Sequence, residues 1–105
     1  MPSTDDPVLS RFRAALDRAY GRNLERVVLY GSRARGDAGR QSDYDVAVFL
    51  KRSRGFGREA RTLAEIETDI LLETGTVINA LPLKAGSHRA RTGLMSEIRR
   101  DGRDL

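Results

Sequence analysis

The fold is decided by two neighbouring stretches, VVLYGSRARG at residues 27–36 and DYDVAVFL at residues 43–50. Each stretch contains a short apolar run, one ending at Tyr30 and the other beginning at Val46. Apolar, β-branched runs of this length predict two buried strands, at residues 26–30 and 43–50. Gly31-Ser32 therefore follows the first strand, and two carboxylates open the second.

Asp43 and Asp45 are the candidate metal ligands. Successive side chains of a strand point to opposite faces, so we expect these two carboxylates on one face and Tyr44 on the other. Mg²⁺ prefers hard oxygen ligands and usually keeps waters and substrate phosphates as its other ligands. The pair thus predicts a site for Mg²⁺ carried by a nucleoside triphosphate such as ATP, although two solvated acids at a strand end remain the simpler alternative.

Gly31, Ser32, Arg33 and Arg35 are the candidate nucleotide-binding residues. Gly31 has no Cβ, which lets the backbone approach a phosphate, and Ser32 offers a hydroxyl. The amides of residues 32–35 are expected to form the first turn of a short helix, where unpaired N–H groups favour an anion. The two arginines add positive charge, or belong to an ordinary solvated turn. The rest of the ten-residue spacer is expected to be a loop that returns the second strand beside the first.

The sequence GSRARGDAGRQSDYDVAVFL, at residues 31–50, resembles the signature of the minimal nucleotidyltransferases of the DNA polymerase beta superfamily. The resemblance implies Mg²⁺-dependent transfer of a nucleoside monophosphate, AMP above all, from an NTP to an acceptor, with pyrophosphate leaving. It also implies a HEPN-domain protein as partner, with the two proteins acting as antitoxin and toxin and a hydroxyl of the partner as the acceptor.

Asn79 departs from the pattern of that family. The family generally carries a third carboxylate in a run of the form apolar-Asp-apolar-apolar, and the matching run here is Ile78-Asn79-Ala80-Leu81. An amide can offer a carbonyl oxygen to a metal, but it brings no charge and accepts no proton. The resemblance therefore makes Asn79 the third catalytic position and leaves an alternative open: a non-catalytic, nucleotide-binding module that neutralises its partner by contact. Asp69 and Glu73, on the preceding helix, are expected to be structural.

Composition is consistent with one small domain at residues 1–105. The chain has no cysteine, so it contains neither disulfides nor thiolate metal sites. No apolar run approaches the length of a membrane span and residues 1–10 lack a leader pattern, so we expect a cytoplasmic protein. The net charge of +4 suits an NTP, an acidic partner or RNA. Because aromatic residues are few, nucleic acid is the less favoured of these partners. Homo- or hetero-oligomerisation stays open.

The remaining elements complete an α/β (α+β) layer fold. Asp6-Pro7 predicts the start of a helix that ends at Gly21. Further predictions are a helix at residues 58–73, a strand at 76–81 closed by Pro82, and a helix at 89–100 that buries Leu94, Met95 and Ile98. The order is α-β-β-α-β-α, with one face of a small mixed three-stranded sheet covered, as in the nucleotidyltransferase fold. His88 is expected to be exposed or to cap the last helix.

Overall fold

The predicted order of helices and strands is present in the computed structural model, which describes residues 6–36, 39 and 43–105. Asp6 caps the first helix as expected, because its carboxylate accepts hydrogen bonds from the amides of Val8 and Leu9. The helices are α1 (Pro7–Tyr20), α2 (Gly31–Arg35), α3 (Phe56–Thr74) and α4 (Gly93–Asp101), with 3₁₀ turns at Gly21–Asn23 and Ser87–Arg89. The strands are β1 (Leu24–Tyr30), β2 (Tyr44–Leu50), β3 (Ile78–Lys84) and β4 (Arg103–Asp104).

The sheet is mixed, as predicted, and its strand order is β3-β2-β1-β4. β2 pairs antiparallel with β1 and parallel with β3, and β4 pairs antiparallel with β1. The expected count of three strands is corrected by β4. A strand of two residues is too short to leave a periodic pattern in the sequence.

Pro82 lies inside β3 instead of closing it, so the predicted end of this strand is wrong. The reason is the position of β3 at the edge of the sheet. The Ala80 amide donates to the Glu67 carboxylate at 2.6 Å and therefore points away from β2. Residues two apart in a strand point their amides the same way, so a proline at position 82 removes no hydrogen bond to β2.

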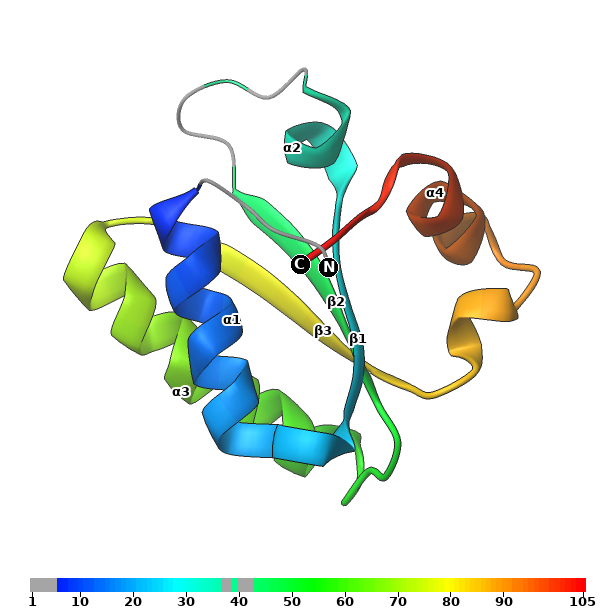
Figure 1. Ribbon diagram of the computed structural model, residues 1–105, viewed down its shortest axis with the longest axis horizontal. Helices are drawn as coiled ribbons and strands as arrows, with labels where there is room; N and C mark the ends of the chain where they lie inside the picture. The colour runs from blue at the N-terminus through cyan, green and yellow to red at the C-terminus, as the bar shows by residue number, and fades with distance from the viewer. Residues whose placement is uncertain (1–5, 37–38, 40–42) are drawn as a thin grey trace.

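Helices cover both faces of the sheet, and the expectation of one covered face is wrong (Figure 1). α1 and α3 pack on one face, around a core that includes Phe12, Leu16, Val46, Val48 and Ile70. α4 packs Met95 and Ile98 on the other face, against Val28, Ala47 and Phe49. Leu94, which was expected in the buried stripe of the last helix, is 37% exposed. That helix begins at Gly93 instead of residue 89, and Leu94 lies in its first turn at the edge of the buried stripe that Met95 and Ile98 form.

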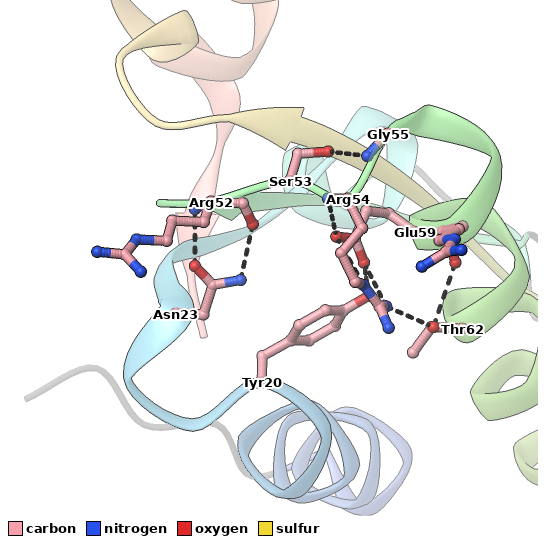
Figure 2. Close-up of polar contacts among 9 residues, drawn as sticks. Tyr20, Asn23, Arg52, Ser53, Arg54, Gly55, Glu59 and Thr62 are labelled. Atoms are coloured by element: carbon pink, nitrogen blue, oxygen red, sulfur yellow. Dashed lines mark hydrogen bonds and ion pairs between the residues drawn. The ribbon is translucent and has the colours of Figure 1, made fainter.

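Glu59 is a buried carboxylate that the sequence analysis did not single out. It is 1% exposed, and Figure 2 shows it at the centre of a polar network between α1, α3 and the connection from β2. The Arg54 guanidinium donates to it at 2.8 Å, the Arg54 amide at 2.9 Å and the Tyr20 hydroxyl at 3.2 Å. The hydrogen bond from the Arg54 side chain is the main cause that lowers the pKa of Glu59. Burial, followed by the nearby charge of Glu59, raises the pKa of Tyr20 to about 12.

Glu59→Gln should therefore lower the free energy of unfolding by about 1–3 kcal/mol at pH 7, because the charged hydrogen bonds to Arg54 are lost in a buried position. The matched control is Glu65→Gln on the exposed side of the same helix, with an expected change within about 0.5 kcal/mol. Urea unfolding measures both. Since the folded pKa of Glu59 is depressed, its contribution is full above the ordinary value of 4.5 and is lost as the pH falls through the lowered pKa. The difference between wild type and Glu59→Gln should shrink in acid, and a difference that is absent at pH 7 would contradict this role.

Candidate active site

Two carboxylates and an amide meet where β2 and β3 begin. The parallel register places Asp45 beside Asn79. The Asn79 amide nitrogen donates to Asp43 Oδ2 at 3.2 Å and to Asp45 Oδ1 at 3.4 Å. Asn79 therefore bridges two groups of like charge and holds them together.

The expected alternation of side chains around Tyr44 is confirmed. Tyr44 is buried in the core beneath α1, and its hydroxyl donates to Asp6. Asp43 and Asp45 lie on the opposite face, the one that α4 covers in part; Asp43 is exposed and Asp45 is half-buried. The hydrophobic side of β2 thus determines which way the carboxylates point.

Gly31 lies against Asp45. Its φ of +74° belongs to the left-handed region that favours glycine, and a Cβ at this position would lie 2.7 Å from Asp45 Oδ2. Ser32 follows in the first turn of α2, so the predicted short helix after the first strand is confirmed. Most of the predicted loop that follows α2, at residues 37–38 and 40–42, lies outside the described residues.

The two candidate arginines lie differently from the carboxylates. The Arg33 guanidinium stacks over the Tyr44 ring, 4.2 Å from its centroid, on the α1 side of the sheet. Arg35 is exposed at the end of α2. The structure therefore brings Gly31, Asp45 and Asn79 together with Asp43, and it directs the guanidinium of Arg33 toward the other face.

Tyr30, the last residue of β1, is a further neighbour of the site. It pairs directly with Asp45 across β1 and β2, so both side chains lie on the same face. Burial is the main cause that raises the pKa of Tyr30, followed by the charges of Asp45 and Glu97. The position of Tyr30 beside Gly31 is visible in the sequence, but its alignment with Asp45 depends on the strand register.

Three acids of α3 lie outside the bridged cluster. Glu73 forms an ion pair with Arg11 at 2.9 Å, in agreement with its expected structural role. Glu67 accepts the Ala80 amide at the edge of β3, and burial raises its pKa. Glu67 was missed, although its spacing from Leu63 and Ile70 places it on the buried stripe of the helix. Asp69 is exposed.

His88 is not part of this site. Its ring packs edge-on against Phe49, with 5.7 Å between the ring centroids, and is half-buried. Burial is the main cause that lowers its pKa, followed by the charges of Arg26 and Arg99. Phe49 lies four residues along β2 from Asp45, or about 13 Å at the usual rise of a strand.

The residues present fit a metal ion that arrives with its nucleotide. In the part of the chain that the structure describes, no group of three or more His, Cys, Asp or Glu side chains is arranged to hold a metal. Two carboxylates are nevertheless a normal protein share for Mg²⁺ when phosphates supply other ligands. Asn79 would contribute through its Oδ1, because its amide nitrogen has no lone pair for a cation.

No helix within residues 6–36, 39 and 43–105 has the length and apolar character needed to cross a membrane.

The family is shown by comparison with known proteins. A family model described as a nucleotidyltransferase domain matches residues 9–100. The chain therefore belongs to the nucleotidyltransferase domain family, which confirms the enzyme class and the fold predicted from the sequence.

Particular relatives are similar over most of the chain. A Methanocaldococcus jannaschii protein named "Putative protein adenylyltransferase" is 29% identical over 77 residues, which are 73% of this chain and 71% of the relative. A crystal structure of a toxin-antitoxin with AMP-PNP matches with a TM-score of 0.65 and 21% identity, covering 90% of this chain and 69% of that one. A complex of a tri-AMPylated Shewanella oneidensis HEPN toxin with an MNT antitoxin matches with a TM-score of 0.56 and 15% identity, covering 92% and 70%.

The contact between Gly31 and Asp45 can be tested with a matched pair of variants. Gly31→Ala and Gly36→Ala both place a side chain at a positive φ, +74° and +81°, and each should cost about 1 kcal/mol of stability. Only at Gly31 would the new Cβ meet Asp45, since nothing lies within 4 Å of it at Gly36. Titration of Mn²⁺ in the presence of ATP should show an affinity about 10–100-fold weaker for Gly31→Ala and unchanged for Gly36→Ala. Equal losses in the two variants would argue against the contact as the reason for glycine at position 31.

Proposed function

We propose that this nucleotidyltransferase transfers a nucleoside monophosphate, AMP in the first instance, from a Mg²⁺-bound NTP to a hydroxyl of a partner protein. The observation that carries the proposal is the cluster of Asp43, Asp45 and Asn79, with Gly31 directly beside Asp45. It combines hard oxygen ligands with a backbone open enough for a phosphate to approach. The name of the M. jannaschii relative supports protein as the acceptor and AMP as the transferred group.

In the proposed reaction, Asp43 and Asp45 hold the divalent ion that accompanies the triphosphate. When bound, Mg²⁺ orients the phosphates and offsets the negative charge that develops during the transfer. Gly31 and Ser32 let the chain approach the phosphates closely. The acceptor oxygen forms a bond to the α-phosphorus while the bond from that phosphorus to pyrophosphate breaks. The hydroxyl proton passes to a carboxylate or to water, because Asn79 cannot accept it.

Asn79 gives this site a specific character. With a neutral amide in place of a third carboxylate, the protein offers two negative charges in this cluster. Two charges suit one nucleotide-bound Mg²⁺ better than a pair of ions, because each further cation needs compensating charge. The proposed enzyme therefore activates its acceptor with little help from a second protein-bound ion, and we expect its turnover to be slow.

We infer that the partner is a HEPN-domain protein and that the chain acts as its antitoxin in the cytoplasm, residues 1–105 forming a single domain. The support is the structural similarity to toxin-antitoxin complexes, one of them containing a tri-AMPylated HEPN toxin. The partly exposed acidic cluster is consistent with this role, since an acceptor on another protein must reach it from solvent.

The second candidate function is a non-catalytic module that binds its partner and neutralises it by contact. The observation that favours it is the hydrogen bonding of Asn79 to both carboxylates. A donor placed between two acids stabilises them without a metal. The two functions differ in whether the acids are needed for neutralisation.

Asp43→Asn/Asp45→Asn should abolish transfer while leaving the fold intact, because the amide side chains keep the shape and remove the charge that holds the metal. We expect at least about a 100-fold loss, as for other groups that stabilise charge in a transition state. The assay follows radiolabel from α-labelled ATP onto a purified HEPN-domain protein that binds this chain. Asp69→Asn, at an exposed acid of α3, is the control and should transfer the label normally.

A wild-type chain that transfers no label with any NTP or divalent metal would contradict the enzymatic proposal. If the double variant still neutralises the toxicity of the partner, the result would favour the second candidate function, the non-catalytic module.

Asn79→Asp should create the third carboxylate and with it a second metal position. The variant should bind two Mn²⁺ ions per chain in the presence of a non-hydrolysable ATP analogue, against one for the wild type, as measured by electron paramagnetic resonance. The rate of transfer should rise by about tenfold or more, within the range of a proton-accepting group. Asn79→Ala is the matched control, and it should neither bind a second Mn²⁺ ion nor transfer the nucleotide faster. One ion in both wild type and Asn79→Asp would show that position 79 does not set the metal count.

A further inference from the structure

The end of the sheet opposite the active site gathers positive charge. β1 begins there and β2 ends there, and the connection after Leu50 lies at the far end of the sheet from α2 (Figure 1). An open pocket of about 690 Å³ at this end is lined by four cationic side chains, together with Tyr20 and Asn23. We call this region the basic pole and define it as Arg22, Lys51, Arg52, Arg54 and Lys84.

The acid of the pocket is already neutralised. Glu59 is 1% exposed and is satisfied by Arg54 and Tyr20, so it offers little negative charge to solvent. In the described part of the chain, no ion pair joins Arg22, Lys51, Arg52 or Lys84 to a carboxylate. All four of these residues are exposed. The pole therefore presents unpaired positive charge, in contrast to the acidic cluster at the other end of the sheet.

The backbone that carries these charges is held in place by side chains. The Asn23 amide donates to the Arg52 carbonyl at 2.8 Å, and its oxygen accepts the Arg52 amide at 2.7 Å. The Ser53 hydroxyl accepts the Gly55 amide at 3.0 Å, and Glu59 accepts the Arg54 amide. Figure 2 shows this network, with the Arg52 side chain pointing away from it. A connection fixed in this way presents Lys51 and Arg52 from an ordered backbone, so little entropy is lost when a ligand binds.

An exposed aromatic ring lies beside the charges. Phe56, the first residue of α3, is 65% exposed. It lines a second pocket of about 230 Å³ that Lys84 and Ser53 also line, and Ser53 belongs to the larger pocket as well. Phe56 and Lys84 thus line a pocket that shares Ser53 with the pocket of the connection. A solvent-exposed phenylalanine contributes nothing to the core and offers a flat face on which a base can stack.

We propose that the basic pole binds single-stranded nucleic acid, with its cations on successive phosphates and Phe56 stacked on one base. Cations along a groove with an exposed aromatic ring are the combination that such binding uses. An acidic protein segment would use the same charges but is matched less well, because it carries no bases to stack on the exposed Phe56 ring. The geometry contains no feature that separates RNA from DNA. This proposal does not rest on the transferase activity, since the two sites lie at opposite ends of the sheet.

The test is fluorescence anisotropy of the full chain with labelled oligouridylate and oligothymidylate of about twelve nucleotides. At physiological salt the dissociation constant should be on the order of 10⁻⁵ M, as for other binding through phosphates, and it should fall at low salt. With three to four phosphates contacted, log K should fall with log salt at a slope of about −2 to −3. Absence of binding by the wild-type chain at low salt would overturn the proposal.

Variants locate the site. Lys51→Ala/Arg52→Ala leaves the backbone contacts of Asn23 intact and should weaken binding about tenfold or more, reducing the salt slope by about 1.4. Arg100→Ala/Arg103→Ala, beside β4, removes the same charge and should have little effect. Equal losses in the two double variants would mean that net charge alone causes the binding, and the assignment of the binding site to the basic pole would be wrong.

The variant Phe56→Leu tests whether the basic pole binds nucleic acid or an acidic protein. Loss of the ring should weaken oligonucleotide binding by about 5- to 150-fold, the equivalent of a stacked base worth about 1–3 kcal/mol, while unfolding in urea stays close to wild type. Unchanged binding by Phe56→Leu, together with displacement of the oligonucleotide by polyglutamate at an equal charge concentration, would assign the pole to an acidic protein instead. Equal affinity for the two oligonucleotides supports recognition through phosphate, and preference for oligouridylate supports RNA as the ligand.

Discussion

The burial of β2 on both faces is the constraint on which the rest of the structure depends. Residues 46–50 are all buried, with alternate side chains under α1 and α3 or under α4. A slip of one residue would exchange every side chain between the two faces, so the register with β1 and β3 has no alternative of similar energy. The same register fixes Asp45 between Tyr30 and Asn79. The hydrophobic core thus places the chemical groups of the site, and Asp45 and Asp43 lie one and three residues before the buried stretch of β2.

Asn79 connects the architecture of the site to its proposed chemistry. A bridging amide donates to two carboxylates and lets them lie side by side. The same amide withholds the third negative charge on which two-metal catalysis relies. At the other end of the sheet, the network around Glu59 orders a connection that carries only positive charge on its exposed side chains. The domain thereby separates an acidic end from a basic end, about one strand length apart.

Much of this could be predicted from the sequence, because the informative signals are local. The two apolar runs predicted β1 and β2, Asp6 predicted the start of α1, and the spacing of Asp43 and Asp45 predicted their common face.

The features that could not be predicted from the sequence depend on contacts between distant segments. β4 has two residues and forms only because β1 offers a free edge. Pro82 is tolerated because β3 is an edge strand, and the direction of the Arg33 side chain follows from the position of the Tyr44 ring. Glu59 and Glu67 lie on the buried stripe of α3. The helical spacing predicts that these two positions are buried, but glutamate is ordinarily an exposed residue, so their burial was not predicted.

The proposed function requires Asp43 and Asp45 to be the metal site of a nucleotide-binding centre. The most direct test is anomalous diffraction from crystals of the wild-type chain grown with Mn²⁺ and a non-hydrolysable ATP analogue. We expect a manganese peak in contact with both carboxylates, with the triphosphate of the analogue completing the coordination beside Gly31. Nucleotide density elsewhere on the chain, or an ordered analogue with no manganese at these two carboxylates, would contradict the account.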